Sequence, residues 1–364
     1  MKEKNNDLGK ISSPPLIIPI FVMNSGCPHR CIFCNQKITA GNYPQKINKQ
    51  YIEREVNSYL DWNRDKSRPI EIAFYGGSFT GIEETYQEEL LSWAQSYIKA
   101  GFVNSIRIST RPDYINAQIL ARLKKYDVFT VEIGAQSFID EVLQFAGRGH
   151  TACDIENAVH LLKEENFKIS LHLMVGLPCD TKDGFIYSLE KTIELKPDTV
   201  RIHPVVVFAG TALAAEFAEG NYQPLSLSEA VSLCALAWKR LSAVGIRVIR
   251  TGLHITKEME AADTVLAGPL HPAFGSLVLA EVYRGQTKKL LEHLPVETKE
   301  INFKLHKQDV SNFRGWQNGN IAAIKKLYPQ ALIKVVTASE QRRGLISAYT
   351  DQGYILNVAI PGIN

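Results

Sequence analysis

The sequence predicts an α/β protein, a partial (β/α)6 barrel of the TIM type with a small C-terminal α+β extension. Two observations favour this fold class. Apolar strand-like segments alternate with helical segments along most of the chain, and parallel strands need such helical crossovers. The 364 residues also suffice for a barrel-sized core and one appendage. An open doubly wound sheet is the alternative, although no Gly-x-Gly-x-x-Gly turn follows the first strand.

Residues 14–260 are expected to form the barrel, in which each of six strands leads into a helix. The expected strands are 16–23, 70–75, 105–109, 128–135, 168–175 and 199–206. The expected helices are 48–62, 83–98, 115–125, 154–166, 182–195 and 227–244. Residues 246–252 are an additional strand candidate.

Residues 1–13 are expected to be a polar tail, and residues 261–364 to be the extension, which opens with a connector rich in Gly and Pro. Its expected elements are strands 301–305, 332–337 and 354–359 and a helix at 321–327. Eight Lys and Arg residues and only three Asp and Glu residues lie between 301 and 364. The aromatic residues interleaved with them are Phe313, Trp316, Tyr328 and Tyr349. This combination is typical of nucleic-acid binding, and a solvated surface is the alternative.

The charge and the cysteine distribution exclude little but favour one compartment. A net charge of +3 neither demands nor excludes an anionic partner. Neither a signal peptide nor a membrane-spanning segment is expected, and Cys153, Cys179 and Cys234 are scattered singly, so no disulfide framework is predicted. Cys179 follows an expected strand and is either a reactive thiol or incidental. We therefore expect a cytoplasmic protein.

A loop after the first strand carries Cys27, Cys31 and Cys34 in a C-x-x-x-C-x-x-C pattern. Three crowded thiolates repel one another unless they share a metal centre. A cubic iron–sulfur cluster has four irons, so a loop with three thiolates leaves one iron open to another ligand. Arg30 and Lys37 add positive charge beside such an anionic cluster. A structural zinc site completed by His29 or a distant residue is the alternative.

The expected strands alternate between apolar and polar residues, and the polar set is rich in Arg, His, Glu and Gln. Its members include Arg107, Ser109, Glu132, Gln136, Ser170, His172, Arg201 and His203. In a barrel the apolar set packs under the helices and the polar set faces the lumen. Because buried polar groups need partners, we expect the lumen to hold a polar ligand. A solvated sheet face is the alternative.

Three loops at strand ends could contact such a ligand. Gly76 and Gly77 let a ligand approach the backbone and expose carbonyls to an ammonium group. Arg148, between two glycines, suits a carboxylate or phosphate. Val175 and Gly176 offer an apolar shelf for an adenine ring. Plain loop geometry is the alternative at the glycine turn and at the arginine.

These motifs resemble the radical S-adenosylmethionine superfamily. Cys27, Cys31 and Cys34 match its cluster motif, Gly76-Gly77-Ser78 matches its glycine motif for the methionine ammonium group, and the segment with Val175 and Gly176 matches its adenine-side motif. Within the superfamily, residues 74–80, 109–115 and 132–137 resemble the radical domain of the Elongator catalytic subunit, a family that modifies wobble uridines in transfer RNA. Gln-Ser and Gly-Arg-x-His segments similar to those of this chain also occur in anaerobic coproporphyrinogen oxidases and their haem-chaperone relatives.

The resemblance implies a 4Fe–4S cluster, S-adenosylmethionine and an enzyme that generates a 5′-deoxyadenosyl radical. It places Gln136 and Arg148 at the ribose and the methionine carboxylate, with Ser109 on the neighbouring strand as a weaker contact. It also implies an RNA nucleoside substrate, in transfer RNA, and a low-potential electron donor of the flavodoxin or ferredoxin type. A tetrapyrrole or another small metabolite is the alternative substrate, and a non-catalytic cluster- or haem-binding protein is the alternative class. No acetyltransferase domain follows the extension, so carboxymethylation that needs acetyl-coenzyme A is not expected of this chain alone.

Overall fold

The structure is a computed structural model that describes residues 15–22, 26–27, 30–41, 44, 46–63, 65 and 67–363. The predicted tail, residues 1–13, lies outside the described residues. Internal contacts divide the chain into two units. The first comprises Met1–His172 and Thr256–Thr264, and the second comprises Leu173–Ile255 and Val265–Asn364.

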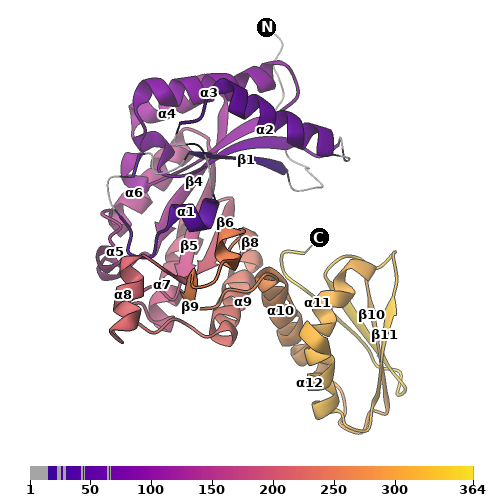
Figure 1. The fold of residues 1–364 in the computed structure, drawn as a ribbon. Coiled ribbons are helices and arrows are strands. Elements are labelled where there is room, and N and C mark those ends of the chain that lie inside the picture. Colours follow the sequence, from indigo (N-terminus) through magenta and orange to yellow (C-terminus); the bar gives the residue numbers. More distant parts are fainter. Residues whose placement is uncertain are drawn as a thin grey trace. The chain divides into compact units, whose positions relative to one another are not determined.

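A seven-stranded sheet, in the order β1-β2-β3-β4-β5-β6-β8, is the largest sheet among the described residues (Figure 1). Its strands are β1 (Leu16–Val22), β2 (Ile70–Gly76), β3 (Ser105–Thr110), β4 (Val128–Gln136), β5 (Lys168–Val175), β6 (Thr199–Pro204) and β8 (Arg247–Thr251). The strands are parallel and curl into a half-barrel, which confirms the predicted partial barrel. The additional strand predicted at 246–252 is β8.

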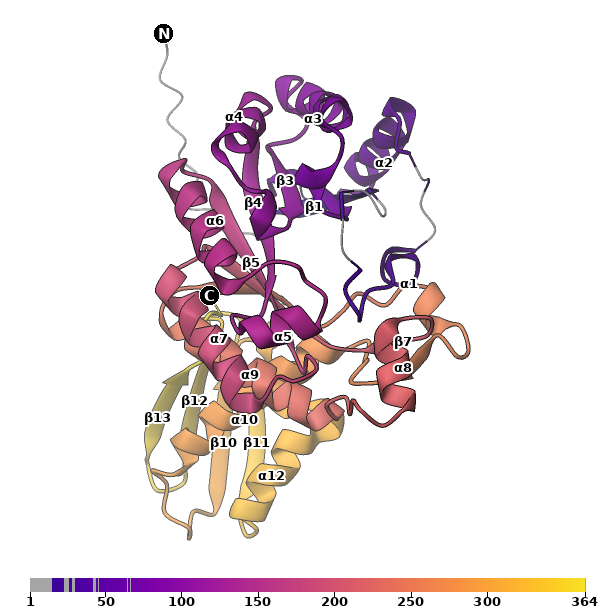
Figure 2. The ribbon, with the colours of Figure 1, turned by 90° about the vertical axis from the view of Figure 1, so that its left-hand side faces the viewer.

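Helices of the first unit pack along the outside of its strands (Figure 2). They are α2 (Lys49–Trp62), α3 (Glu84–Lys99), α4 (Ala117–Lys125) and α6 (Ala152–Glu164). Each begins directly after a residue whose side chain accepts hydrogen bonds from the first helical N–H groups: Asn48, Glu83, Asn116 and Thr151. Such caps satisfy N–H groups that have no partner within the helix, so the helices start close to the predicted positions.

The apolar face of the first unit's strands is completely buried. Ile72, Ile106, Ile108, Val131 and Ile133 have no measurable exposure. They alternate with polar residues as the sequence predicted, so the polar set lies on the opposite face of the sheet.

Some of the side chains on the polar face of the sheet form ion pairs and hydrogen bonds with one another. Arg107 Nε donates to Glu71 Oε2 at 2.8 Å, Arg107 Nη1 lies 3.5 Å from Glu132 Oε2, and Thr130 donates to Glu71 Oε1 at 2.9 Å. All of these side chains are buried. We expected the polar groups of the lumen to need a ligand. The charged groups of this cluster instead find partners within the protein, because the carboxylates and the guanidinium come from neighbouring strands.

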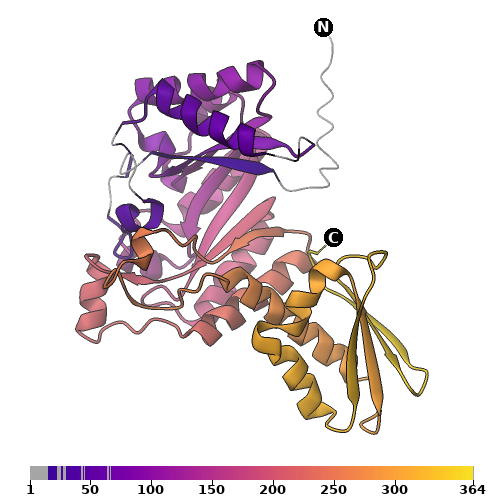
Figure 3. The same cartoon turned by 45° about the vertical axis from the view of Figure 1, so that its right-hand side comes forward.

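The second unit contains the rest of the barrel and a four-stranded sheet in the order β11-β10-β12-β13. The strands of this small sheet are β10 (Glu300–Leu305), β11 (Leu332–Thr337), β12 (Leu345–Thr350) and β13 (Ile355–Ala359). The helices of this unit are α7 (Lys182–Leu195), α8 (Ala212–Ala218), α9 (Leu227–Ala243), α10 (Phe274–Leu291), α11 (Val310–Arg314) and α12 (Gly319–Leu327). Helices α10, α11 and α12 lie on one face of the small sheet (Figure 3). None of the helices within the described ranges is long and apolar enough to span a membrane.

Several elements were not predicted. The largest is helix α10, whose buried residues lie on more than one side because it packs against both α9 and α11. It therefore lacks the single apolar stripe that marks an amphipathic helix, and Gly275 and Gly285 weaken its propensity. The shorter omissions are α1 (Gln36–Ala40), α5 (Asp140–Phe145), α8, α11, the antiparallel pair β7 (Val207–Phe208) and β9 (Val265–Ala267), and β12.

The Arg107 cluster predicts a large stability effect. Replacing Arg107 with Leu leaves Glu71 and Glu132 buried without their cation, so the free energy of unfolding should fall by about 3–5 kcal/mol. Urea unfolding followed by circular dichroism measures this change. The control is Arg54→Leu, which removes an exposed cation beside Glu55 and should cost less than about 1 kcal/mol. Equal effects of the two substitutions would contradict a structural role for the cluster.

Candidate cofactor site

The cysteine loop is anchored in the first unit by backbone hydrogen bonds. Ile32 N donates to Ala146 O at 3.1 Å, and Cys34 N donates to Cys31 O at 3.0 Å. Helix α1 follows directly, capped by the side chain of Asn35. Cys31 is half-buried, Cys27 and Cys34 are exposed, and all three are free thiols. His29, which could complete the alternative zinc site, lies outside the described residues.

The surroundings of Cys27 and Cys34 raise the pKa of both thiols when no metal is bound. Desolvation raises the pKa of Cys27, and the neighbouring Cys31 raises it further, against a hydrogen bond from the Ser78 backbone that lowers it. Cys34 keeps an exposed surface, yet desolvation of its thiol and repulsion from Cys31 and Cys27 raise its pKa to about 12. Cluster binding would therefore release protons and remove the repulsion.

The donor set fits an iron–sulfur cluster. Among the described residues, no group of three His, Cys, Asp or Glu side chains is close enough together to hold a single metal ion. A cubic cluster does not need such a group, because each thiolate binds a different iron. One loop with three free thiols and no carboxylate between Cys27 and Gln36 suits the soft ligand preference of that cluster.

Arg148 connects the cysteine loop to the end of strand β4. Its Nη1 donates to Cys31 Sγ at 3.1 Å, and its Nη2 donates to Gly134 O at 2.8 Å. Its Nε is buried and has no hydrogen-bond partner among the described residues. Arg148 therefore holds one candidate ligand thiol and keeps one N–H for another acceptor.

Two glycines make room for this arginine. A Cβ on Gly134 would lie 3.1 Å from Arg148 Nη2, and a Cβ on Gly147 would lie 3.0 Å from Arg30 O. Gly147 also has a φ of 66°, which side chains other than glycine rarely adopt. The glycine before Arg148 thus allows its segment to lie directly against the cysteine loop.

Arg111 forms a hydrogen bond with the backbone of Arg148. Its Nη1 donates to Arg148 O, and its Nε and Nη2 bind both carboxylate oxygens of Asp113 at 2.9 and 2.8 Å. His150, two residues after Arg148, is buried, and its Nε2 lies 3.4 Å from Ala135 O. Burial, with the charges of Arg148 and Arg111, lowers the pKa of His150 to about 3, so the imidazole is neutral near pH 7.

The glycine turn after β2 packs directly on the cysteine loop. A Cβ on Gly26 would lie 2.1 Å from Ser78 O, and a Cβ on Gly81 would lie 2.3 Å from Gly26 O, so the two backbones touch. The Ser78 hydroxyl is 2.9 Å from Thr110 Oγ1 and accepts from Arg111 N at 3.2 Å. The Ser78 side chain is thus already bonded, whereas Gly76 and Gly77 are half-buried.

Gln136 and Ser109 lie on the polar face of neighbouring strands. Gln136 has a φ of 65°, an unfavourable conformation for a residue with a side chain. Its Nε2 lies 3.4 Å from His172 Nδ1, and its buried Oε1 has no hydrogen-bond partner among the described residues. Ser109 is half-buried and lies beside Glu132 in the sheet register. An unsatisfied buried oxygen at a strained residue indicates a site for a donor from a ligand.

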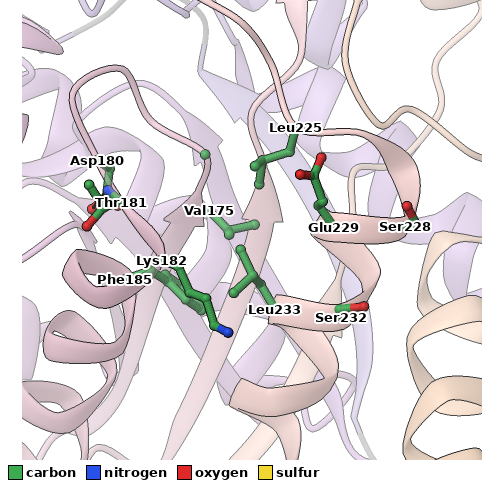
Figure 4. A pocket seen from close by; sticks show the side chains of 11 residues that line it. Val175, Asp180, Thr181, Lys182, Phe185, Leu225, Ser228, Glu229, Ser232 and Leu233 are labelled. Atoms are coloured by element: carbon green, nitrogen blue, oxygen red, sulfur yellow. Dashed lines mark hydrogen bonds between the residues drawn. The ribbon is translucent and has the colours of Figure 1, made fainter.

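Val175 and Gly176 lie in the second unit, at a cavity of about 350 Å³ between the first turns of α7 and α9 (Figure 4). Asp180 and Thr181 lie on one side of the cavity, and Leu225 and Glu229 on the other. Gly176 has a φ of 82°, and a Cβ on it would lie 2.9 Å from Leu225 Cδ1.

The carbonyl of Gly176 already has a partner, because Tyr222 Oη donates to it at 2.7 Å. Burial raises the pKa of Tyr222, so this hydroxyl stays protonated. Cys179 is exposed in the same loop, and its φ is 61°. Apolar side chains, among them Val175, Phe185 and Leu225, line the cavity together with polar and charged ones. The adenine contact that the sequence predicted for this segment stays a prediction.

Sequence reasoning missed several residues that build the site: Gly26, Gly81, Thr110, Gly134, His150 and Tyr222. Thr110 is the last residue of strand β3 and Arg111 follows it directly, a position typical of functional residues in parallel sheets. That position was the available signal. The close contacts of Gly26, Gly81 and Gly134 give no signal in the sequence, because they depend on which loops become neighbours in the fold.

The cysteine loop, the arginine beside it and the strand-end glycines define a class of radical enzyme that uses an iron–sulfur cluster. Two family models match consecutive segments of the chain: the radical SAM superfamily over residues 21–191 and the radical SAM C-terminal domain over residues 197–284. The chain belongs to the radical SAM superfamily. Its cofactors are accordingly a 4Fe–4S cluster and S-adenosylmethionine.

Among curated relatives, the chain is similar to the tRNA uridine(34) acetyltransferase of Methanocaldococcus jannaschii, with 25% identity over 332 residues, 81% of this chain and 60% of that protein. It is also similar to Elongator complex protein 3 of Mus musculus, with 28% identity over 189 residues, 46% of this chain and 34% of that protein. The chain thus spans at most about 60% of the length of these relatives.

A solved structure of the archaeal Methanocaldococcus infernus Elp3, with an N-terminal deletion, has the same fold. The TM-score is 0.56 and the identity 22%, over 79% of this chain and 66% of that chain. The superfamily and the likeness to Elongator proteins confirm the resemblance drawn from the motifs.

The cysteine assignment predicts a loss of iron. Cys31→Ala removes the thiol that Arg148 contacts, so after anaerobic reconstitution the chain should lose most of its iron, its sulfide and its visible absorbance. Cys179→Ala removes an exposed cysteine outside the loop and should keep all three. Full iron content in the Cys31→Ala chain would show that the ligands lie elsewhere.

The burial of Asp180 should make the stability of the chain depend on pH. Burial raises its pKa from 3.8 to about 6, so the native state binds this proton more tightly than the unfolded state. The resulting stabilisation is present below about pH 4 and is lost as the pH rises through about 6. Asp180→Asn should therefore raise the free energy of unfolding by about 2 kcal/mol near pH 7 and by little near pH 4. Urea unfolding at both pH values tests this, and a difference that is the same at both would contradict it.

Proposed function

We propose that the chain is a radical S-adenosylmethionine enzyme that modifies a nucleoside of RNA, with transfer RNA as the substrate class. The likeness to the tRNA uridine(34) acetyltransferase carries this proposal, because it covers 81% of the chain and so reaches beyond the segment that would bind the cofactors. Elongator complex protein 3 supports the same substrate class over the shorter segment that it matches.

Residues of the first unit would hold the cofactors. Cys27, Cys31 and Cys34 would bind three irons and leave the fourth to S-adenosylmethionine. The bound, reduced cluster would supply an electron for the reductive cleavage of S-adenosylmethionine, and the cofactors together would supply hydrogen-atom abstraction from the substrate. Gly76 and Gly77 would offer backbone carbonyls to the methionine ammonium group.

Arg148 and Gln136 would position the same cofactor. The free Nε of Arg148 would donate to the methionine carboxylate, while its two Nη atoms keep the cysteine loop in place. The free Oε1 of Gln136 would accept from a ribose hydroxyl, and Ser109 on the next strand is a weaker contact. In the second unit, Val175 and Gly176 would contact the adenine.

The electron would come from a low-potential flavodoxin or ferredoxin. Such donors and an oxygen-sensitive cluster require a reducing compartment, so we place the protein in the cytoplasm.

Two linked measurements test the proposal. Under anaerobic conditions with a strong reductant, the reconstituted chain should convert S-adenosylmethionine into 5′-deoxyadenosine, and the Cys31→Ala chain should not. Mass spectrometry of transfer-RNA nucleosides should then show one modified nucleoside that is lost with the gene and restored by wild type but not by Cys31→Ala.

The two measurements test the catalytic activity and the RNA substrate separately. An intact cluster without any 5′-deoxyadenosine would contradict the enzyme and favour a non-catalytic cluster-binding protein. Turnover with an unchanged nucleoside profile would contradict the RNA substrate and favour a tetrapyrrole or another small metabolite.

A further inference from the structure

The second unit contains a helical hairpin between two strands. Strand β10 leads into α11, a short loop, α12 and then β11, and β10 and β11 pair in parallel from Glu300 and Leu332 to Leu305 and Thr337. Strand β11 is at the edge of the sheet (Figure 1). Residues 315–318 form the loop between the two helices of this β-α-α-β arrangement.

This loop is built in one defined conformation. Gly315, Gln317 and Asn318 have φ values of 70°, 49° and 59°, and only the first is a glycine. The side chain of Asn320 fixes the turn, because its Nδ2 donates to Ala280 O in α10 at 2.9 Å and to Phe313 O in α11 at 3.1 Å. The packing of the hairpin thus overcomes an unfavourable backbone at two adjacent residues.

The loop displays a tryptophan. Trp316 is 59% exposed, and its ring centroid lies 5.4 Å from that of His271 in an edge-to-face arrangement. Two of the aromatic residues that the sequence associated with nucleic acid, Phe313 and Tyr328, are instead buried in the unit. Of that set, Trp316 offers the largest free ring face.

Unpaired cations gather on the same hairpin. Lys307, Arg314, Lys325 and Lys326 are exposed and have no ion-pair partner among the described residues. Three cations on the strands and loops beside this hairpin are instead ion-paired: Lys304 pairs with Glu340, Lys334 with Glu300 and Arg343 with Asp309.

The charge of the hairpin is therefore not neutralised locally. Residues 306–331 contain four Lys and Arg residues and one acid, Asp309, which is buried against Arg343. A polyanion complements such a surface.

We propose that α11, the loop at 315–318 and α12, which together we call the Trp316 hairpin, bind single-stranded RNA; this rests on the proposed RNA substrate. Trp316 stacks on an unpaired base, and Arg314, Lys325 and Lys326 contact phosphates. KH modules clamp a strand of nucleic acid in a comparable way, with a Gly-x-x-Gly loop between two helices, whereas here Gly315 and Gly319 flank three residues.

An RNA duplex fits the same features less well. Its bases are stacked on one another and offer no free face to Trp316, so only the cations of the hairpin could contact it. We therefore expect single strands and loops to bind more tightly than duplexes of the same length.

Fluorescence anisotropy with a labelled single-stranded RNA of about ten nucleotides tests this surface on the full chain. Trp316→Ala should weaken binding about tenfold, because one stacking contact is lost. The matched control is Trp62→Ala, which removes an even more exposed tryptophan, at the end of helix α2, and should leave the affinity unchanged. Thermal unfolding of each variant shows that the fold is intact.

The salt dependence of the same binding tests the cations. The double substitution Lys325→Ala with Lys326→Ala should reduce the slope of log K against log salt by about 1.4, as expected for two lost phosphate contacts to a single strand. The control pair, Lys304→Ala with Lys334→Ala, removes lysines that are already ion-paired and should change the slope little.

Wild-type affinity in both Trp316→Ala and the double lysine variant would overturn the proposal, as would equal binding of single-stranded and duplex RNA. Binding is measured without reductant, so it is independent of turnover. If the hairpin variants lose RNA binding but the nucleoside profile does not depend on the gene, the proposed reaction is refuted and the RNA-binding hairpin is supported. If the nucleoside profile depends on the gene but the hairpin variants bind RNA like wild type, the hairpin proposal is refuted and the proposed reaction is supported.

Discussion

Arg148 joins the cysteine loop to the end of strand β4, and the arrangement of the cofactor site depends on this one side chain. Its two hydrogen bonds, to Cys31 Sγ and Gly134 O, use donors that are fixed in one plane, so the loop and the strand are held in one relative position. Gly134 and Gly147 are required on either side because any Cβ would meet Arg148 or Arg30. Arg111 then fixes Arg148 through its carbonyl.

The polar face of the first unit divides into a structural part and a part open to ligands. Near the middle of the strands, Arg107 is neutralised by Glu71 and Glu132. At the carboxyl ends of the strands, Arg148 Nε and Gln136 Oε1 are buried and have no partners among the described residues. An unsatisfied buried polar atom costs about 1–3 kcal/mol, and a ligand that bonded to these two atoms would remove that cost. Both lie at the end of the sheet where parallel α/β proteins bind ligands.

The sequence predicted the barrel and the cysteine loop because both depend on local patterns. Strand alternation, helix caps such as Asn48 and Thr151, and the spacing of Cys27, Cys31 and Cys34 are all visible within short segments. Helix α10 was missed because it is buried on several sides and so has no apolar stripe. The partners of Arg148 and the pairing of Arg107 could not be predicted either, since they depend on which strand ends become neighbours.

Hydrogen–deuterium exchange of the backbone amides in residues 30–36 tests most directly whether Arg148 holds the cysteine loop. In the iron-free chain, Arg148→Gln should accelerate exchange in this segment, including the Ile32 amide that donates to Ala146 O, because the bond to Cys31 Sγ is lost. Exchange in the hairpin at 310–327 serves as the internal control and should not change. Unaltered exchange in residues 30–36 would contradict the account, because the loop would then keep its position without Arg148.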